Sequence, residues 1–144
     1  MARVKIVIPD NNIGSFAIPV RITDINYGNH VGNDSFVSIL HEARVKWLNQ
    51  YNLTELNIDG IGLIMSDLEI EFKKESFYGD IIEVQLSIGE ISRIGFELYY
   101  QLRTKRHEEP VILANAKTGM VCYNYLNNEM TAIPDVLKNI LAQK

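Results

Sequence analysis

The fold is decided by the stretch Asp24-Ile25-Asn26-Tyr27-Gly28-Asn29-His30-Val31-Gly32-Asn33-Asp34, which separates two strongly patterned segments. Before it, an alternation typical of a half-buried strand runs through Phe16, Ile18, Val20 and Ile22. After it, roughly over residues 34–50, one face of an amphipathic helix carries Phe36, Ile39, Leu40, Ala43 and Trp47. Asn33 or Asp34 is placed to cap this helix. A polar loop with a histidine at a helix N-terminus suits reactions that build negative charge on an oxygen, although a plain capped turn has the same composition.

Length and composition point to a single globular domain over residues 1–144. The chain has 144 residues, which is enough for one sizeable core and too few for two. It is 47% hydrophobic and 22% charged, as is usual for a globular protein. A formal net charge of −4 argues against nucleic-acid binding, which needs a concentrated basic face. The sequence has no apolar run that could span a membrane and no apolar signal segment, so we expect a cytoplasmic protein.

Cysteine and histidine usage excludes several kinds of site. The single cysteine, Cys122, rules out a disulfide framework and is placed like a small buried hydrophobe. The three histidines are too scattered for a metal motif, so no metal site is predicted. Two basic clusters, Lys73-Lys74 and Arg103-Thr104-Lys105-Arg106, are either solvated strand ends or contacts for a phosphorylated ligand.

Four more alternating segments follow the helix, at residues 67–72, 82–88, 96–103 and 112–122. In the last of them Ile112 is predicted to lie on the same side of the strand as Ala114 and Cys122. Short turns between consecutive strands predict an antiparallel meander with one apolar face. The helix is the one predicted element long enough to cover that face. A short C-terminal helix is predicted to begin at Pro134. The fold class is therefore α+β, one long helix against a curved antiparallel sheet.

This order of elements resembles the hotdog fold, and several motifs extend the likeness over nearly the whole chain. The segment Asp24–Asn33 resembles the Asp-x-Asp/Asn-x-x-x-His-Val-x-Asn signature of hotdog thioesterases, both the hydroxybenzoyl-CoA-like and the acyl-carrier-protein-like groups. Three further segments resemble motifs of the same thioesterases: the helix pattern Leu40–Arg44, the Tyr-Gly-Asp corner within Glu71–Asp80, and Ala132-Ile133-Pro134 before the terminal helix. The resemblance implies hydrolysis of an acyl thioester by general-base activation of water, in acyl-CoA and fatty acid metabolism. Coenzyme A or phosphopantetheine would enter as part of the substrate, with no separate cofactor.

The resemblance also implies candidate catalytic residues. The position of the catalytic carboxylate in the hydroxybenzoyl-CoA-type group corresponds to Asn26 in this chain. The amide of Asn26 can orient water but cannot act as a base. Asp24 is an alternative carboxylate, although a turn role also fits it. The acyl-carrier pattern corresponds to Asn26, His30 and Glu75, with Gly28 where that group has an asparagine. A neutral imidazole is a suitable base near pH 7, whereas Glu75 beside two lysines also fits a surface ion pair.

Binding groups and partners follow from the same likeness. Backbone N–H groups around Gly32 and Asn33 are the predicted oxyanion donors. The carrier phosphate is assigned to basic residues, namely Lys73, Lys74, Arg103 and Arg106. The expected partner is acyl-CoA or an acyl-carrier protein. An open sheet edge is usually paired, so a homodimer or homotetramer is predicted.

Two functions from different classes remain open on the sequence. The first is an acyl thioester hydrolase. The second is a non-catalytic hotdog module that binds acyl ligands or partner proteins, and Asn26 and Gly28 are the residues that favour it. A hydratase on the same fold is the weaker third reading, because fold alone does not decide the reaction.

Overall fold

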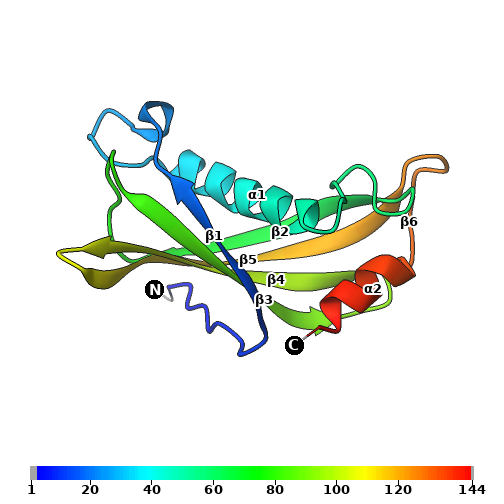
Figure 1. Cartoon of the computed structure of the whole chain (residues 1–144). Coiled ribbons are helices and arrows are strands. Elements are labelled where there is room, and N and C mark those ends of the chain that lie inside the picture. The colour runs from blue at the N-terminus through cyan, green and yellow to red at the C-terminus, as the bar shows by residue number, and fades with distance from the viewer. Residues whose placement is uncertain (1–2, 144) are drawn as a thin grey trace.

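The computed structural model describes residues 3–143, and the predicted α+β architecture is confirmed (Figure 1). Helix α1 (Asn33–Asn49) lies across one face of a curved antiparallel sheet, and a short helix, α2 (Asp135–Leu141), lies near the C-terminus. The strands are β1 (Asn12–Pro19), β2 (Gly62–Phe72), β3 (Ile81–Ile91), β4 (Gly95–Arg106), β5 (Glu109–Asn124) and β6 (Glu129–Met130). A 3-10 turn, η1 (Ile22–Asp24), stands between β1 and α1.

The strand order differs from the predicted meander at one strand. The sheet order is β1-β3-β4-β5-β2, with β6 paired to β5, so β3, β4 and β5 form a meander while β2 pairs with β5 at the far edge. Helix α1 explains the displacement. Its 17 residues span about 25 Å, whereas the two edge strands are separated by four spacings, about 19 Å. The helix therefore carries the chain from one edge of the sheet to the other.

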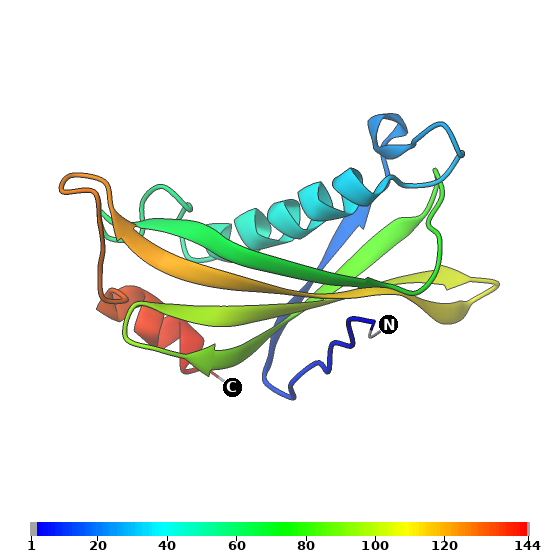
Figure 2. The same ribbon diagram turned by 180° about the vertical axis from the view of Figure 1, so that it is seen from behind.

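The predicted apolar face of α1 forms the centre of the core. Side chains from Phe36 to Leu48 on this face are buried, and Ala43, Trp47 and Leu48 have no exposed surface. They pack against the inward side chains of the sheet, among them Ile82, Val84, Leu98, Tyr100 and Ala116. The opposite face of the sheet is crossed by the segment 3–11, as both ribbon views show (Figures 1 and 2). Helix α1 therefore packs on one face of the sheet, and segment 3–11 lies on the other.

A buried polar network also fixes how α1 sits on the sheet. Arg44 is 6% exposed, and its Nη1 donates to the Tyr100 hydroxyl at 3.1 Å. Its Nε donates to Glu55 Oε2 at 3.2 Å, and the Tyr100 hydroxyl pairs with Thr118 Oγ1 at 2.7 Å. Buried polar groups need such partners, so the network allows one rotational setting of the helix. The position of the helix N-terminus follows from that setting.

Two sequence expectations at the start of α1 are wrong. Ile22 lies outside the strand and is 69% exposed, because Pro19 lacks an N–H and the Asp24 carboxylate accepts the N–H of Arg21, which turns the chain. The residue that caps α1 is Gly32, with no side-chain cap, because Asn33 is already helical. The first correction lengthens the connection between the strand and the helix, and the second moves the start of the helix back to Asn33.

Two further expectations are wrong nearer the C-terminus. Ile112 was predicted to face the core but is 40% exposed, whereas Leu113 is fully buried. A register shift between Leu102 and Arg103 opposite this segment changes which residues of β5 face inward. Pro134 is the N-cap of α2 rather than its first helical residue.

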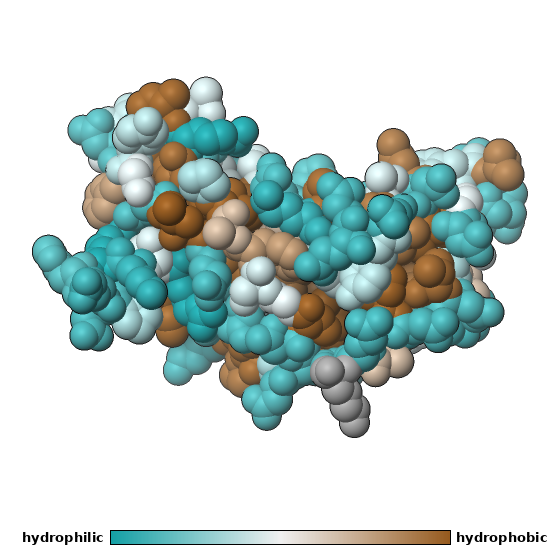
Figure 3. Space-filling view, viewed as in Figure 1, coloured by the Kyte–Doolittle hydropathy of each residue, from teal (hydrophilic) through white to brown (hydrophobic). Residues whose placement is uncertain are grey.

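The surface of α1 is hydrophilic over its exposed side, while apolar groups gather near the loop that precedes it (Figure 3). Exposed large side chains at that end include Ile22, Tyr27, Phe77 and Tyr78. None of the helices among residues 3–143 is long and apolar enough to cross a membrane.

Candidate active site

The loop between η1 and α1 is held in a fixed shape by backbone hydrogen bonds. The Asn26 N–H donates to the His30 carbonyl at 2.9 Å, and the Gly32 N–H donates to the Asp24 carbonyl at 3.0 Å. Asn29, at the tip, adopts the left-handed conformation (φ 65°), which asparagine tolerates better than most residues. The Val31 N–H donates to the Ser76 carbonyl at 2.8 Å. The loop is therefore closed on itself and fastened to the turn between β2 and β3.

The loop brings Asn26 and His30 together around Gly28. Asn26 Oδ1 accepts the Gly28 N–H at 2.9 Å. A methyl group on Gly28 would lie 3.2 Å from His30 Nε2 and 3.3 Å from Asn26 Oδ1, so both side chains flank this glycine. Because the Oδ1 atom is engaged, Asn26 presents its NH2 group to any ligand.

His30 has a defined tautomer in this setting. Its Nδ1 lies 3.2 Å from the Val31 carbonyl, and a carbonyl only accepts, so this contact places the proton on Nδ1. Nε2 then carries the lone pair and lies 4.0 Å from Glu75 Oε1. The His30 side chain is 32% exposed and that of Glu75 is 66% exposed, so Nε2 is accessible from solvent. An accessible Nε2 with a carboxylate nearby is arranged to accept a proton.

The N-terminus of α1 lies next to this pair. Gly32 caps the helix, and a methyl group there would lie 3.6 Å from Asn26 Cβ. The prediction that Gly32 supplies an oxyanion donor is wrong, because its N–H already donates to the Asp24 carbonyl. The first-turn N–H groups of Asn33 and Asp34 have no acceptor within the helix. They carry the positive end of the helix dipole, which favours an anion. Asn26, His30 and these N–H groups thus combine a base with donors for an oxyanion.

Asp24 lies on the other side of the loop with its carboxylate occupied. Its side chain is 4% exposed, and Oδ2 accepts the Arg21 N–H at 2.8 Å. The Arg21 guanidinium contacts the same carboxylate at 3.2 Å. In this structure Asp24 stabilises the turn before α1.

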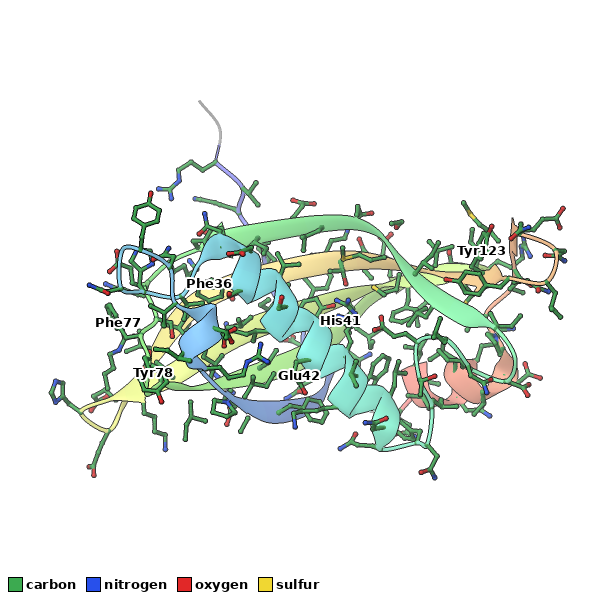
Figure 4. All side chains as sticks on the ribbon, turned by 90° about the horizontal axis from the view of Figure 1, so that it is seen from above. Phe36, His41, Glu42, Phe77, Tyr78 and Tyr123 are labelled. Carbon is green, nitrogen blue, oxygen red and sulfur yellow. The ribbon has the colours of Figure 1, made fainter. Side chains whose placement is uncertain are left out.

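Two ionisable residues, His41 and Glu42, lie further along α1, beyond its first turn. His41 and Glu42 leave the helix on opposite sides (Figure 4). His41 pairs with Glu55 at 2.6 Å, and Glu42 lines a cavity of about 200 Å³ with Arg21 and Lys46. Although Glu42 and Lys46 are four positions apart on the helix, no ion pair joins them within the described residues.

The basic residues predicted for a carrier phosphate are mostly paired. Lys73 contacts Glu71 at 3.4 Å, Arg103 pairs with Glu83, and Arg106 contacts Asp80 at 2.8 Å. Arg103 also lines a cavity of about 580 Å³ on the face of the sheet opposite α1, together with Lys105, Ala17, Ile81 and Pro110. Neither His30 nor Glu75 lines that cavity, so it is separate from the loop.

Ser76 and Asp80 both lie in the segment Glu71–Asp80, but no sequence pattern indicated a role for either. Ser76 is fully buried, and its hydroxyl donates to Asp80 Oδ2 at 2.8 Å. Burial alone would raise the pKa of Asp80, but hydrogen bonds from the Phe77 N–H, Arg106 and Ser76 outweigh it and lower that pKa below its ordinary value. The turn that receives the Val31 N–H is therefore rigid.

Cys122 takes no part in this site. It is buried in β5, and burial raises the pKa of its thiol to about 11. A thiol in that state is a poor nucleophile near neutral pH.

The chain is similar to several known proteins in sequence and in fold. A family model described as the thioesterase-like superfamily matches residues 20–141. Two 1,4-dihydroxy-2-naphthoyl-CoA hydrolases are similar in sequence. The hydrolase of Microcystis aeruginosa is 29% identical over 73% of this chain and 75% of its own length. The hydrolase of Gloeothece citriformis is 30% identical over 86% of this chain and 88% of its own length. Among solved structures, a 1,4-dihydroxy-2-naphthoyl-CoA thioesterase from Synechocystis superposes with a TM-score of 0.80 at 23% identity, covering 90% of this chain and 95% of that chain.

The ionised state of Asp80 gives a prediction for stability. In the folded protein the pKa of Asp80 lies below the ordinary value of 3.8. The ionised carboxylate therefore adds to the free energy of unfolding above that pH, and this contribution is lost as the pH falls through the folded pKa. We expect Asp80→Asn to cost about 1–2 kcal/mol at pH 7 and the difference from wild type to shrink below about pH 4. Thermal unfolding from pH 7 to pH 3 measures this.

The exposed Asp59, replaced by asparagine, is the control for that experiment. A difference between wild type and Asp80→Asn that stays constant down to pH 3 would contradict the assignment.

Proposed function

Since the chain belongs to the thioesterase-like superfamily, we propose that it hydrolyses an acyl-CoA thioester to a free acid and coenzyme A. One structural observation connects this proposal with particular residues. His30 Nε2 and Asn26 Oδ1 flank Gly28, and Asn26 Cβ also lies beside Gly32, the residue that caps α1. Thioester hydrolysis needs a base for water and donors for an oxyanion, and these groups supply both.

We assign the steps as follows. His30 Nε2 accepts a proton from water as the water oxygen attacks the thioester carbonyl carbon. The carbonyl oxygen becomes an oxyanion, which the Asn33 and Asp34 N–H groups stabilise together with the Asn26 amide. The C–S bond then breaks, and the proton on His30 goes to the departing thiolate. Glu75 stabilises the imidazolium between these two transfers.

Coenzyme A, rather than a carrier protein, is the thiol that we propose. The similar hydrolases from Microcystis aeruginosa and Gloeothece citriformis are both named for a CoA thioester. Of the four basic residues predicted for the phosphate, Lys74 has no ion pair among the described residues and directly precedes Glu75. We assign Lys74 the first contact with the phosphates of the substrate.

Replacing His30 tests the proposed reaction. We expect His30→Ala to lower kcat/KM for acyl-CoA by about 100-fold, the usual scale for lost acid–base catalysis, with unchanged thermal stability. Thiol release measured with a chromogenic disulfide gives the rate. The matched control is His41→Ala, because His41 pairs with Glu55 away from the loop. Wild-type turnover in folded His30→Ala protein would move the base to Asp24 or Glu75.

A non-catalytic acyl-binding module is the second candidate, and Asn26 is the observation that favours it. The substitution Asn26→Asp separates the two readings. It keeps the acceptor for the Gly28 N–H, removes the NH2 donor and adds a negative charge where the oxyanion develops. We expect kcat/KM to stay level or fall. A tenfold rise, about 1.4 kcal/mol of transition-state stabilisation, would identify the native protein as a binder that has lost its carboxylate.

We also propose that the protein is a homodimer joined through β2, or a homotetramer built from two such dimers. β2 and β1 are the two edge strands of the sheet. β1 ends in Pro19, which has no N–H to donate, whereas β2 is longer and contains no proline. Met65 and Phe72 are each 41% exposed on β2, so this edge offers both unpaired backbone groups and apolar surface.

Light scattering at tens of micromolar checks the assembly. We expect a mass of twice the 16.4 kDa chain or a higher even multiple. A monomer at that concentration would overturn the proposal.

A further inference from the structure

Arg106, the last residue of β4, reaches the turn that carries Glu75. Its Nη2 donates to the Glu75 carbonyl at 2.7 Å and to Asp80 Oδ2 at 2.8 Å. The guanidinium carbon lies 5.0 Å from the centre of the Phe77 ring. A planar guanidinium can serve two acceptors and an aromatic face at once, which a lysine ammonium does not reproduce.

These contacts continue to the histidine loop. Arg106 holds the carbonyl of Glu75, and the next residue, Ser76, is held through its hydroxyl by Asp80. The Ser76 carbonyl accepts the Val31 N–H, and Val31 directly follows His30. Backbone on both sides of the 4.0 Å contact between His30 and Glu75 is therefore fixed by one charged pair, Arg106 with Asp80.

We propose that Arg106 is a positioning residue for the hydrolysis: it fixes the Glu75 backbone so that the carboxylate stays beside His30 Nε2. The Glu75 side chain is 66% exposed, so packing does not hold it, and its place depends on where its backbone is fixed. This inference rests on the proposed function. It replaces the expectation that Arg106 binds a phosphate of the substrate.

The two roles predict different kinetics. A phosphate ligand raises KM for acyl-CoA when it is lost and leaves a thioester without phosphates unaffected. A positioning residue lowers kcat for both kinds of substrate, because small displacements of a catalytic group weaken the transition state. An acyl-CoA and the matching acyl-N-acetylcysteamine thioester are therefore the two probes.

The experiment compares Arg106→Gln, Arg106→Lys and wild type on both probes, with Arg93→Gln as the control. Arg93 is exposed in the turn before β4 and loses the same charge. We expect Arg106→Gln to lower kcat about tenfold on both substrates, with KM changed less than about twofold, and Arg106→Lys to fall between. Arg93→Gln leaves kcat unchanged.

A double-mutant cycle with Glu75→Gln tests whether Arg106 acts through Glu75. We expect the loss caused by Arg106→Gln to shrink to less than about twofold when the carboxylate is already absent. Fully additive losses would overturn the inference. So would a lower melting temperature with unchanged kcat, which marks a structural role, or a KM increase on acyl-CoA alone, which marks a phosphate ligand. If wild type hydrolyses neither substrate, the proposed function itself fails and this inference fails with it.

Discussion

The hydrogen bond from the Val31 N–H to the Ser76 carbonyl, 2.8 Å long, is the constraint on which the candidate site depends. It joins two segments that are 45 positions apart, the loop before α1 and the turn after β2. Without it, His30 and Glu75 would belong to independent surface loops. With it, the imidazole, a carboxylate and the start of a helix share one end of the molecule. The bond is protected because Ser76 is fully buried.

The position of α1 matters as much as the loop. A helix N-terminus stabilises an oxyanion only if its free N–H groups face the reacting carbonyl. The setting of α1 on the sheet is fixed by its apolar face and by the buried contacts of Arg44 with Tyr100 and Glu55. The fold therefore positions the N–H donors of α1, and the loop positions the proposed base, His30. Asn26 links the two, since it flanks both Gly28 and Gly32.

Much of this architecture could be predicted from the sequence. Alternation and helical periodicity located α1 and the five main strands, because these patterns report which face of an element is buried. They do not report which strands are neighbours, and so the place of β2 at the far edge was missed. A register shift, as at Leu102, likewise leaves no mark in the alternation of a single strand, which is why Ile112 was misplaced. Gly32 was not predicted as a cap because its role depends on backbone conformation alone.

The candidate site was predicted less completely than the fold. Motif likeness singled out Asn26, His30 and Glu75, and the structure brings these three residues to one end of the sheet. Their roles stay predictions. The partner of Arg106 was not foreseen, because Asp80 lies 26 positions away and only the sheet brings them together. A basic cluster read along the chain suggested a phosphate site, whereas in space each arginine of that cluster faces a carboxylate.

In the proposed mechanism, water activated by His30 attacks the thioester directly, and no carboxylate of the protein forms a covalent intermediate. A single turnover in water enriched in the heavy isotope of oxygen, with enzyme in excess over acyl-CoA, tests this most directly. We expect the released acid to carry the heavy oxygen after the first turnover. Heavy oxygen found in a glutamate or aspartate of the protein, with the first acid unlabelled, would contradict it.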